Sequence, residues 1–143
     1  MSTIMRAKAA IAALEAGMQA DAKTATDLLG RKPGLTVVVV GDDPASAIYV
    51  RNKQKRAEAL GVSAKTVHLP GTIGQAELLA TVAELNADDN VDGIIVQLPL
   101  PEQIDDDAVI NAIADAKDVD GFTLRTTGRL WTLPKWSTEQ VGP

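Results

Sequence analysis

The run Val37-Val38-Val39-Val40 constrains the fold of this chain more than any other stretch. Four consecutive β-branched residues are typical of a strand that is buried on both faces. Gly41 then lets the backbone turn, Asp43 is a good N-cap residue, and Pro44 suits the first position of a helix. The sequence therefore predicts a buried strand that leads directly into a helix.

Strands and helices alternate along most of the chain. Apolar residues recur at helical spacing in residues 4–29, 44–60, 72–85 and 105–113. Shorter apolar runs predict strands at residues 35–40, 62–69 and 93–96. This alternation predicts an α/β fold, a three-layer open parallel sheet with right-handed crossovers and helices on both faces.

Local signals mark the ends of these helices. Gly61 suits the position just after a helix, and Thr72 and Gln75 have the spacing of a capping box. The acids at 105–107 are interpreted as N-caps rather than as metal ligands, because no further ligand lies at a suitable spacing.

The last part of the chain follows a different pattern. Residues 122–125 and 129–133 alternate around Thr127-Gly128, which is compatible with a C-terminal hairpin. Residues 134–143 show no clear pattern. At 143 residues, we expect residues 1–143 to form a single domain.

Composition excludes several classes of function. The chain has no cysteine, which rules out disulfides, thiolate zinc sites and cysteine nucleophiles, and a net charge of −5 argues against a nucleic-acid partner. No apolar run approaches the roughly 20 residues that span a bilayer. The N-terminus lacks a signal-peptide cleavage pattern and carries Glu15 and Asp21, so we expect a cytoplasmic protein with no membrane partner.

Tyr49 and Lys53 are the first candidate site residues. They are four apart on the predicted helix and therefore share a face near the carboxyl end of the buried strand, where ligands bind in open α/β sheets. The neighbouring cations Arg51, Lys55 and Arg56 make the neutral amine of Lys53 more accessible as a base, although they also fit a solvated basic face. Tyr49 either stacks on a flat ligand or packs at the helix–sheet seam.

Polar residues in two loops are further candidates. Gln97 directly follows an apolar run and precedes the rigid Leu98-Pro99-Leu100-Pro101 segment, so its amide either faces a pocket or has a structural role. Asp120 lies in a charged turn, where aspartate often binds local backbone amides. His68 has no metal partner at ligand spacing, so a metal role is not expected.

Phosphate-binding loops are absent from the sequence. Neither the P-loop pattern nor G-x-G-x-x-G occurs, and Asp42 and Asp43 follow Gly41 where a phosphate needs bare amides. The sequence therefore predicts that this chain binds no nucleotide cofactor.

Three blocks together resemble one family. VVVVGDDPASAIYVRNKQKRAEALGV, DGIIVQLPLP and KDVDGF are similar, in order and spacing, to the signature blocks of the bifunctional methylenetetrahydrofolate dehydrogenase/methenyltetrahydrofolate cyclohydrolase family. The resemblance covers about residues 34–130, and residues 131–143 form a divergent tail. It implies one-carbon folate metabolism, with hydrolysis of 5,10-methenyltetrahydrofolate to 10-formyltetrahydrofolate.

The resemblance also implies roles for individual residues. Lys53 matches the catalytic lysine that handles proton transfer as water adds to the methenyl bridge. Gln97 matches the glutamine that hydrogen-bonds near this lysine and tunes the lysine. Tyr49 matches the tyrosine that stacks on the folate and helps to orient the lysine. Asp120 matches the aspartate that holds the pterin ring, and Ser46 and Pro99 lie in the matching blocks as substrate contacts.

The chain also departs from the family pattern. Family members are about twice as long, with a dinucleotide-binding domain after the catalytic one, and we find neither that domain nor the usual Asp-Gly-Lys block near the N-terminus. Thr126 stands where the family usually has asparagine. We therefore expect a folate substrate, no bound cofactor, and loss of the NADP-dependent dehydrogenase step carried out by full-length members.

Two alternatives remain open from the sequence. One is a non-catalytic engineered or degenerate fragment that acts as a folded scaffold or a self-associating domain, since apolar edges left by a missing domain favour a homodimer. The other is a flavodoxin-like binding module for another ligand, which fits the fold but not the three blocks.

Overall fold

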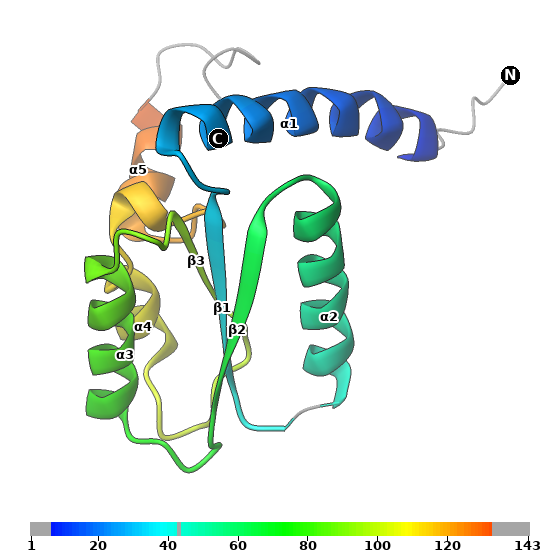
Figure 1. Cartoon of the computed structure of the whole chain (residues 1–143). Helices are drawn as coiled ribbons and strands as arrows, with labels where there is room; N and C mark the ends of the chain where they lie inside the picture. The colour runs from blue at the N-terminus through cyan, green and yellow to red at the C-terminus, as the bar shows by residue number, and fades with distance from the viewer. Residues whose placement is uncertain (1–6, 43, 133–143) are drawn as a thin grey trace, which may run out of the picture.

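The fold is that of a computed structural model, which describes residues 7–42 and 44–132 (Figure 1). The expected N-cap at Asp43 and the patternless tail at 134–143 lie outside this range. Within it, no helix combines the length and the apolar character needed to cross a membrane.

A parallel sheet of three strands forms the centre of the structure. β1 (Gly34–Val40) lies between β2 (Ser63–Leu69) and β3 (Gly93–Val96), in the order β2-β1-β3. Val37 pairs with Thr66 on one side and with Ile95 on the other. The valine run therefore occupies the central strand, where both edges and both faces are covered, and the predicted α/β fold is confirmed.

Helices cover both faces of this sheet (Figure 1). α2 lies on one face, α3 and α4 lie on the other, and α1 crosses the end at which β1 begins. The helical segments are α1 (Ala7–Leu29), α2 (Pro44–Ala59), α3 (Gln75–Ala87), α4 (Asp106–Asn111), the 3-10 turn η1 (Asp115–Lys117) and α5 (Leu124–Thr132).

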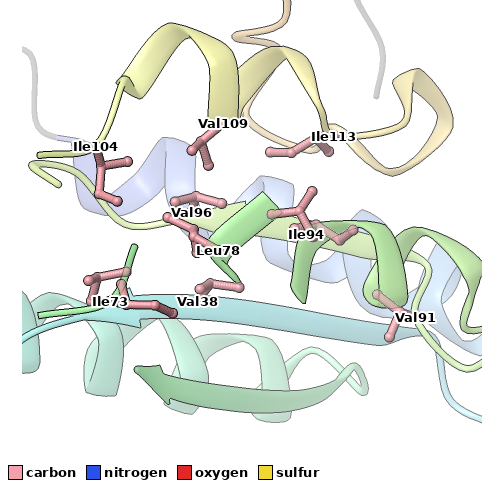
Figure 2. Packing of buried hydrophobic residues seen from close by; sticks show 11 residues of the cluster. Val38, Ile73, Leu78, Val91, Ile94, Val96, Ile104, Val109 and Ile113 are labelled. Atoms are coloured by element: carbon pink, nitrogen blue, oxygen red, sulfur yellow. The ribbon is translucent and has the colours of Figure 1, made fainter. Parts of the chain in front are cut away.

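Alternate residues of β1 supply two separate cores, because successive side chains of a strand point to opposite faces. Val37 and Val39 pack with Val50 of α2. Val38 packs on the other face with residues of α3, α4 and β3. Figure 2 shows this larger cluster, in which Val109 of α4 and Ile113, just beyond the end of α4, lie against Val96 and Ile94 of β3.

The expected C-terminal hairpin is wrong, because residues 124–132 form helix α5. Polar side chains accept hydrogen bonds from backbone amides in the first turn of this helix. Thr123 Oγ1 accepts from the Thr126 amide at 3.2 Å, and Asn111 Oδ1 accepts from the Leu124 amide at 2.8 Å. Asn111 comes from α4. A capping group 13 residues away therefore outweighs the local alternation.

One of the predicted helix starts is also wrong. α3 begins at Gln75 after Gly74, which makes no side-chain cap, so Thr72 and Gln75 form no capping box. Gln75 instead accepts a hydrogen bond from the backbone amide of Asp105 at 2.8 Å. The N-cap at Asp105 is confirmed, since its side chain accepts from the Ala108 amide at 3.1 Å.

Candidate active site

Gln97 lies directly beyond β3, at the carboxyl edge of the sheet. Its backbone amide donates to Val38 O at 2.9 Å, which continues the pairing of β3 with β1. Its side-chain Nε2 donates to Leu98 O at 2.8 Å, so the amide oxygen Oε1 is turned away from the loop. Oε1 accepts a hydrogen bond from Lys53 Nζ at 3.3 Å.

Lys53 reaches this amide from the middle of α2. Its side chain is half-buried, while Arg51, Lys55 and Arg56 of the same helix are exposed. The structure thus separates Lys53 from the solvated basic residues around it. A contact between residues 44 positions apart brings together two of the predicted catalytic groups.

Tyr49 lies one turn before Lys53 on α2. It is 65% exposed, whereas Val50 beside it is only 4% exposed and fills the seam between α2 and β1. The ring of Tyr49 therefore does not form part of the core. An exposed aromatic ring next to a polar cluster is available to a flat ligand.

Asp120 is carried on a loop that runs beside β3. Asp118 forms an isolated parallel bridge with Ile94, so the loop and the strand run in the same direction. Asp120, two residues further on, is thereby carried toward Val96, and both residues line a small cavity. The Asp120 carboxylate is exposed, and among the described residues it has no hydrogen-bond partner.

Asp118 organises the turn in which Asp120 lies. Its Oδ1 accepts from the backbone amides of Gly121 at 2.9 Å and Phe122 at 3.3 Å, and its Oδ2 accepts from the amide of Thr123 at 3.0 Å. Burial raises the pKa of Asp118, but the hydrogen bonds from the Thr123 amide and from the side chains of Thr126 and Thr123 outweigh it, and the pKa lies below its ordinary value. The backbone-binding role considered for Asp120 belongs to Asp118.

The other predicted site residues are less informative. Pro99 is exposed and follows a cis Leu98–Pro99 peptide bond in the loop after Gln97. Ser46 lies in the first turn of α2, but its side chain is outside what the structure describes. His68 is exposed on β2, and in the described part of the chain no group of three or more histidine, aspartate or glutamate side chains could hold a metal ion.

The opposite, amino edge of the sheet carries a charge pair. The Arg31 guanidinium binds both carboxylate oxygens of Asp92, at 2.6 and 3.0 Å, and Asp92 also accepts from the Gly34 amide at 2.6 Å. The hydrogen bond from Arg31 lowers the pKa of Asp92 despite some burial. These groups tie the start of β1 to the start of β3.

A cavity of about 380 Å³ also lies at this amino edge. It is lined by Arg31, Lys65, Val67, Leu85, Asn90 and Val91 among others. It is larger than the cavity next to Asp120, but its arginine is already paired with Asp92 and none of the candidate site residues line it. We therefore place the candidate site at the carboxyl edge, where the polar groups lack such partners.

Taken together, the fold and this cluster define an α/β domain with a candidate ligand site at the carboxyl ends of its parallel strands. The model of the family described as "Tetrahydrofolate dehydrogenase/cyclohydrolase, catalytic domain" matches residues 5–120, and the chain belongs to this family. The match begins nearer the N-terminus than the resemblance in the sequence blocks and ends at Asp120.

Curated relatives agree with the family. The chain is 56% identical over 119 residues to the bifunctional protein FolD of Acidiphilium cryptum, which covers 83% of this chain and 41% of that protein. It is 51% identical over 122 residues to the bifunctional protein FolD of Anaplasma phagocytophilum, covering 76% of this chain and 40% of the relative. The chain thus spans about two-fifths of the length of these relatives.

Solved structures share the fold. A 5,10-methylenetetrahydrofolate dehydrogenase from the silkworm Bombyx mori matches 91% of this chain and 45% of its own, with a TM-score of 0.86 and 39% identity. The bifunctional enzyme FolD of Campylobacter jejuni matches 82% of this chain and 43% of its own, with a TM-score of 0.75 and 43% identity.

Proposed function

We propose that this chain hydrolyses 5,10-methenyltetrahydrofolate to 10-formyltetrahydrofolate, as part of one-carbon folate metabolism. The observation that carries the proposal is the hydrogen bond from Lys53 Nζ to Gln97 Oε1 at the carboxyl edge of the sheet. Membership of the tetrahydrofolate dehydrogenase/cyclohydrolase family supports the choice of substrate.

Lys53 is the proposed proton-transfer group. In the reaction, the oxygen of a water molecule adds to the carbon that bridges N5 and N10, and the water loses one of its protons. The bond from that carbon to N5 then breaks as the new hydroxyl gives up its proton and N5 takes one up, which leaves a formyl group on N10 and an N–H at N5. A general base and acid within reach of this carbon accelerates both steps. Gln97 holds the amine in place through its oriented amide oxygen.

Tyr49 and Asp120 are the proposed folate-binding groups. The exposed ring of Tyr49 offers a face on which a pterin stacks, and the Asp120 carboxylate offers two acceptors for the N–H groups of the ring. Ser46 and Pro99 lie in the same region of the chain, on the first turn of α2 and in the loop after β3, and are proposed as further substrate contacts.

We further propose that the dehydrogenase step does not take place on this chain alone. Hydride transfer needs a nicotinamide held against the substrate, and the sequence has no dinucleotide-binding loop. The family member from Trypanosoma brucei was solved in complex with NADP, and this chain covers 44% of that protein. Calorimetric titration of this chain with NADP should show no saturable binding, and a saturable isotherm would contradict the proposal.

The direct test is turnover of 5,10-methenyltetrahydrofolate, followed by the loss of its absorbance. Lys53→Met should lower the rate by about a hundredfold or more, the contribution typical of a general acid–base group. Lys55→Met is the matched control, because Lys55 is an exposed lysine of the same helix and should keep wild-type activity. A wild-type rate equal to the rate of hydrolysis in buffer alone, or an active Lys53→Met variant, would contradict the proposal.

One observation favours a second function, that of a non-catalytic domain which self-associates. α1 exposes large apolar side chains, with Leu14 at 65%, Met18 at 52% and Leu28 at 82%. Apolar groups gathered on one surface mark interaction sites more often than scattered ones do. Sedimentation of the wild type should then show a dimer that Leu14→Asp converts to monomer, whereas a monomeric wild type would remove this alternative.

A further inference from the structure

We propose that Asp118 and Gly93 are positioning residues that set the Asp120 carboxylate beside the end of β3. This inference deepens the proposed function and rests on it for the identity of the ligand that Asp120 holds. Neither residue touches that ligand. Both act through the loop on which Asp120 lies.

The contacts of Asp118 fix the chain on the far side of Asp120. Its two carboxylate oxygens accept the amides of three consecutive residues, 121 to 123. The hydroxyls of Thr123 and Thr126, 2.9 Å apart, complete the polar surroundings of this carboxylate. A carboxylate that binds several backbone amides holds them more strongly than a neutral acceptor does.

Gly93 fixes the chain on the near side of Asp120. A Cβ atom on Gly93 would lie 2.6 Å from Val119 Cγ1 and 3.3 Å from Leu35 Cδ1. The Val119 side chain therefore lies directly over the bare backbone of Gly93. Together with the Asp118–Ile94 bridge, this contact seats the loop on β3.

Asp120 differs from the residues around it. The residues before it are seated on β3 and the residues after it are bound to Asp118, yet its own carboxylate is exposed and has no protein partner within the described ranges. A rigid support around an unpaired polar group is the arrangement expected of a preorganised ligand contact. Its position then depends on residues that never meet the ligand.

Asp118→Asn tests the carboxylate. The variant keeps the size of the side chain but turns one acceptor oxygen into an NH2 group that faces a backbone N–H. We expect the Kd for tetrahydrofolate, measured by calorimetry, and the KM for 5,10-methenyltetrahydrofolate to rise about tenfold, while kcat changes little because Lys53 and Gln97 are untouched. A fall in kcat with an unchanged KM would overturn the inference.

Asp88→Asn is the matched control for this variant. Asp88 also accepts a backbone amide in a turn, from Asn90 at 2.8 Å, and hydrogen bonds from Asn90 lower its pKa as well. It lies in the turn after α3, at the amino edge. Its substitution should leave Kd and KM unchanged, and an equal effect of both variants would show that general stability, not loop position, is being measured.

The contact between Gly93 and Val119 offers a test by rescue. Gly93→Ala should raise the KM about tenfold, because the new methyl group displaces Val119 and the loop with it. Val119→Ala removes the opposing methyl groups, so the double variant Gly93→Ala, Val119→Ala should recover most of the lost affinity. Failure of the second substitution to restore the KM would show that the contact between Gly93 and Val119 does not hold the loop in position against β3.

Amide hydrogen exchange separates this inference from the proposed function. In Asp118→Asn, the amides of residues 121 to 123 should exchange at least about tenfold faster than in the wild type, while those of β1 keep their rates. If the wild type binds no tetrahydrofolate but this local change is seen, the proposed ligand is wrong and the positioning role stands. If the three amides exchange at wild-type rates, the positioning role is wrong whatever the ligand.

Discussion

The two edges of the sheet use polar residues in opposite ways. At the amino edge, Arg31 and Asp92 form two hydrogen bonds with each other, and Asp92 accepts a third from Gly34. At the carboxyl edge, Lys53 and Gln97 share one hydrogen bond of 3.3 Å, and Asp120 has no partner among the described residues. Polar groups that satisfy one another hold strands together, whereas polar groups left incomplete are available to a ligand.

The same strand serves both edges. β1 begins at Gly34, where Asp92 binds its first amide, and its residue Val38 accepts the amide of Gln97 through its carbonyl. The charge pair that links β1 to β3 therefore lies where β1 starts, and the candidate site lies where the strands end. This division matches the general placement of ligands at the carboxyl ends of parallel strands.

The amino edge should show the largest effect on stability. Arg31→Met leaves the Asp92 carboxylate without its guanidinium partner, and because the pair is about one-third exposed we expect the free energy of unfolding to fall by more than it does on loss of a fully exposed ion pair. Denaturant titration measures this loss. Calorimetry on the same variant should show an unchanged Kd for tetrahydrofolate. A weakened affinity would contradict the assignment of stability to the amino edge and of ligand binding to the carboxyl edge.

A substitution at the carboxyl edge should have a smaller effect, and this effect should be on turnover rather than on stability. Gln97→Leu removes the acceptor that holds Lys53 Nζ, and we expect kcat to fall about tenfold with little change in unfolding free energy. Gln19→Leu is the control for loss of a side-chain amide, since Gln19 Nε2 donates to Ala59 O at 3.3 Å but lies on α1, away from the carboxyl edge. A Gln97→Leu variant that is destabilised yet fully active would reverse the expected pattern.

The smallest expected effect is on the pH dependence of stability. The pKa of Asp92 is lowered by Arg31 in the folded state, so its contribution is present above the unfolded pKa of about 4 and is lost as the pH falls through the folded value. Arg31→Met lets this pKa return toward its ordinary value. The difference in unfolding free energy between wild type and variant should therefore shrink below about pH 4, and a constant difference at all pH values would argue against the ion pair as its source.

The sequence predicted the elements whose signals are local. The valine run, Gly61 and Pro44 each determine nearby backbone geometry, and the structure confirms a central strand, a helix that begins at Pro44 and a positive φ of 92° at Gly61. The carboxyl edge of the sheet was expected to carry both Lys53 and Gln97, and the family resemblance implied the contact between them that the structure shows.

The sequence could not predict features that depend on distant partners. α5 is capped in part by Asn111, and in place of the expected capping box at Thr72, Gln75 Oε1 accepts a hydrogen bond from the amide of Asp105, 30 residues away. The sequence analysis also missed that the Asp118 carboxylate binds backbone amides of its turn. An aspartate three residues before a glycine in a turn is a recognisable signal for this role. The catalytic and binding roles of the site residues stay predictions.

The most direct test is a titration of the isotopically labelled chain with tetrahydrofolate, followed by amide chemical shifts. We expect the shifts to be confined to the carboxyl edge, at residues 49–53, 97–98 and 119–121. Residues 31–36 and 88–92, which surround the amino-edge charge pair and its cavity of about 380 Å³, should not move. Shifts centred on that cavity, or no shifts at all, would contradict the placement of the ligand site at the carboxyl edge.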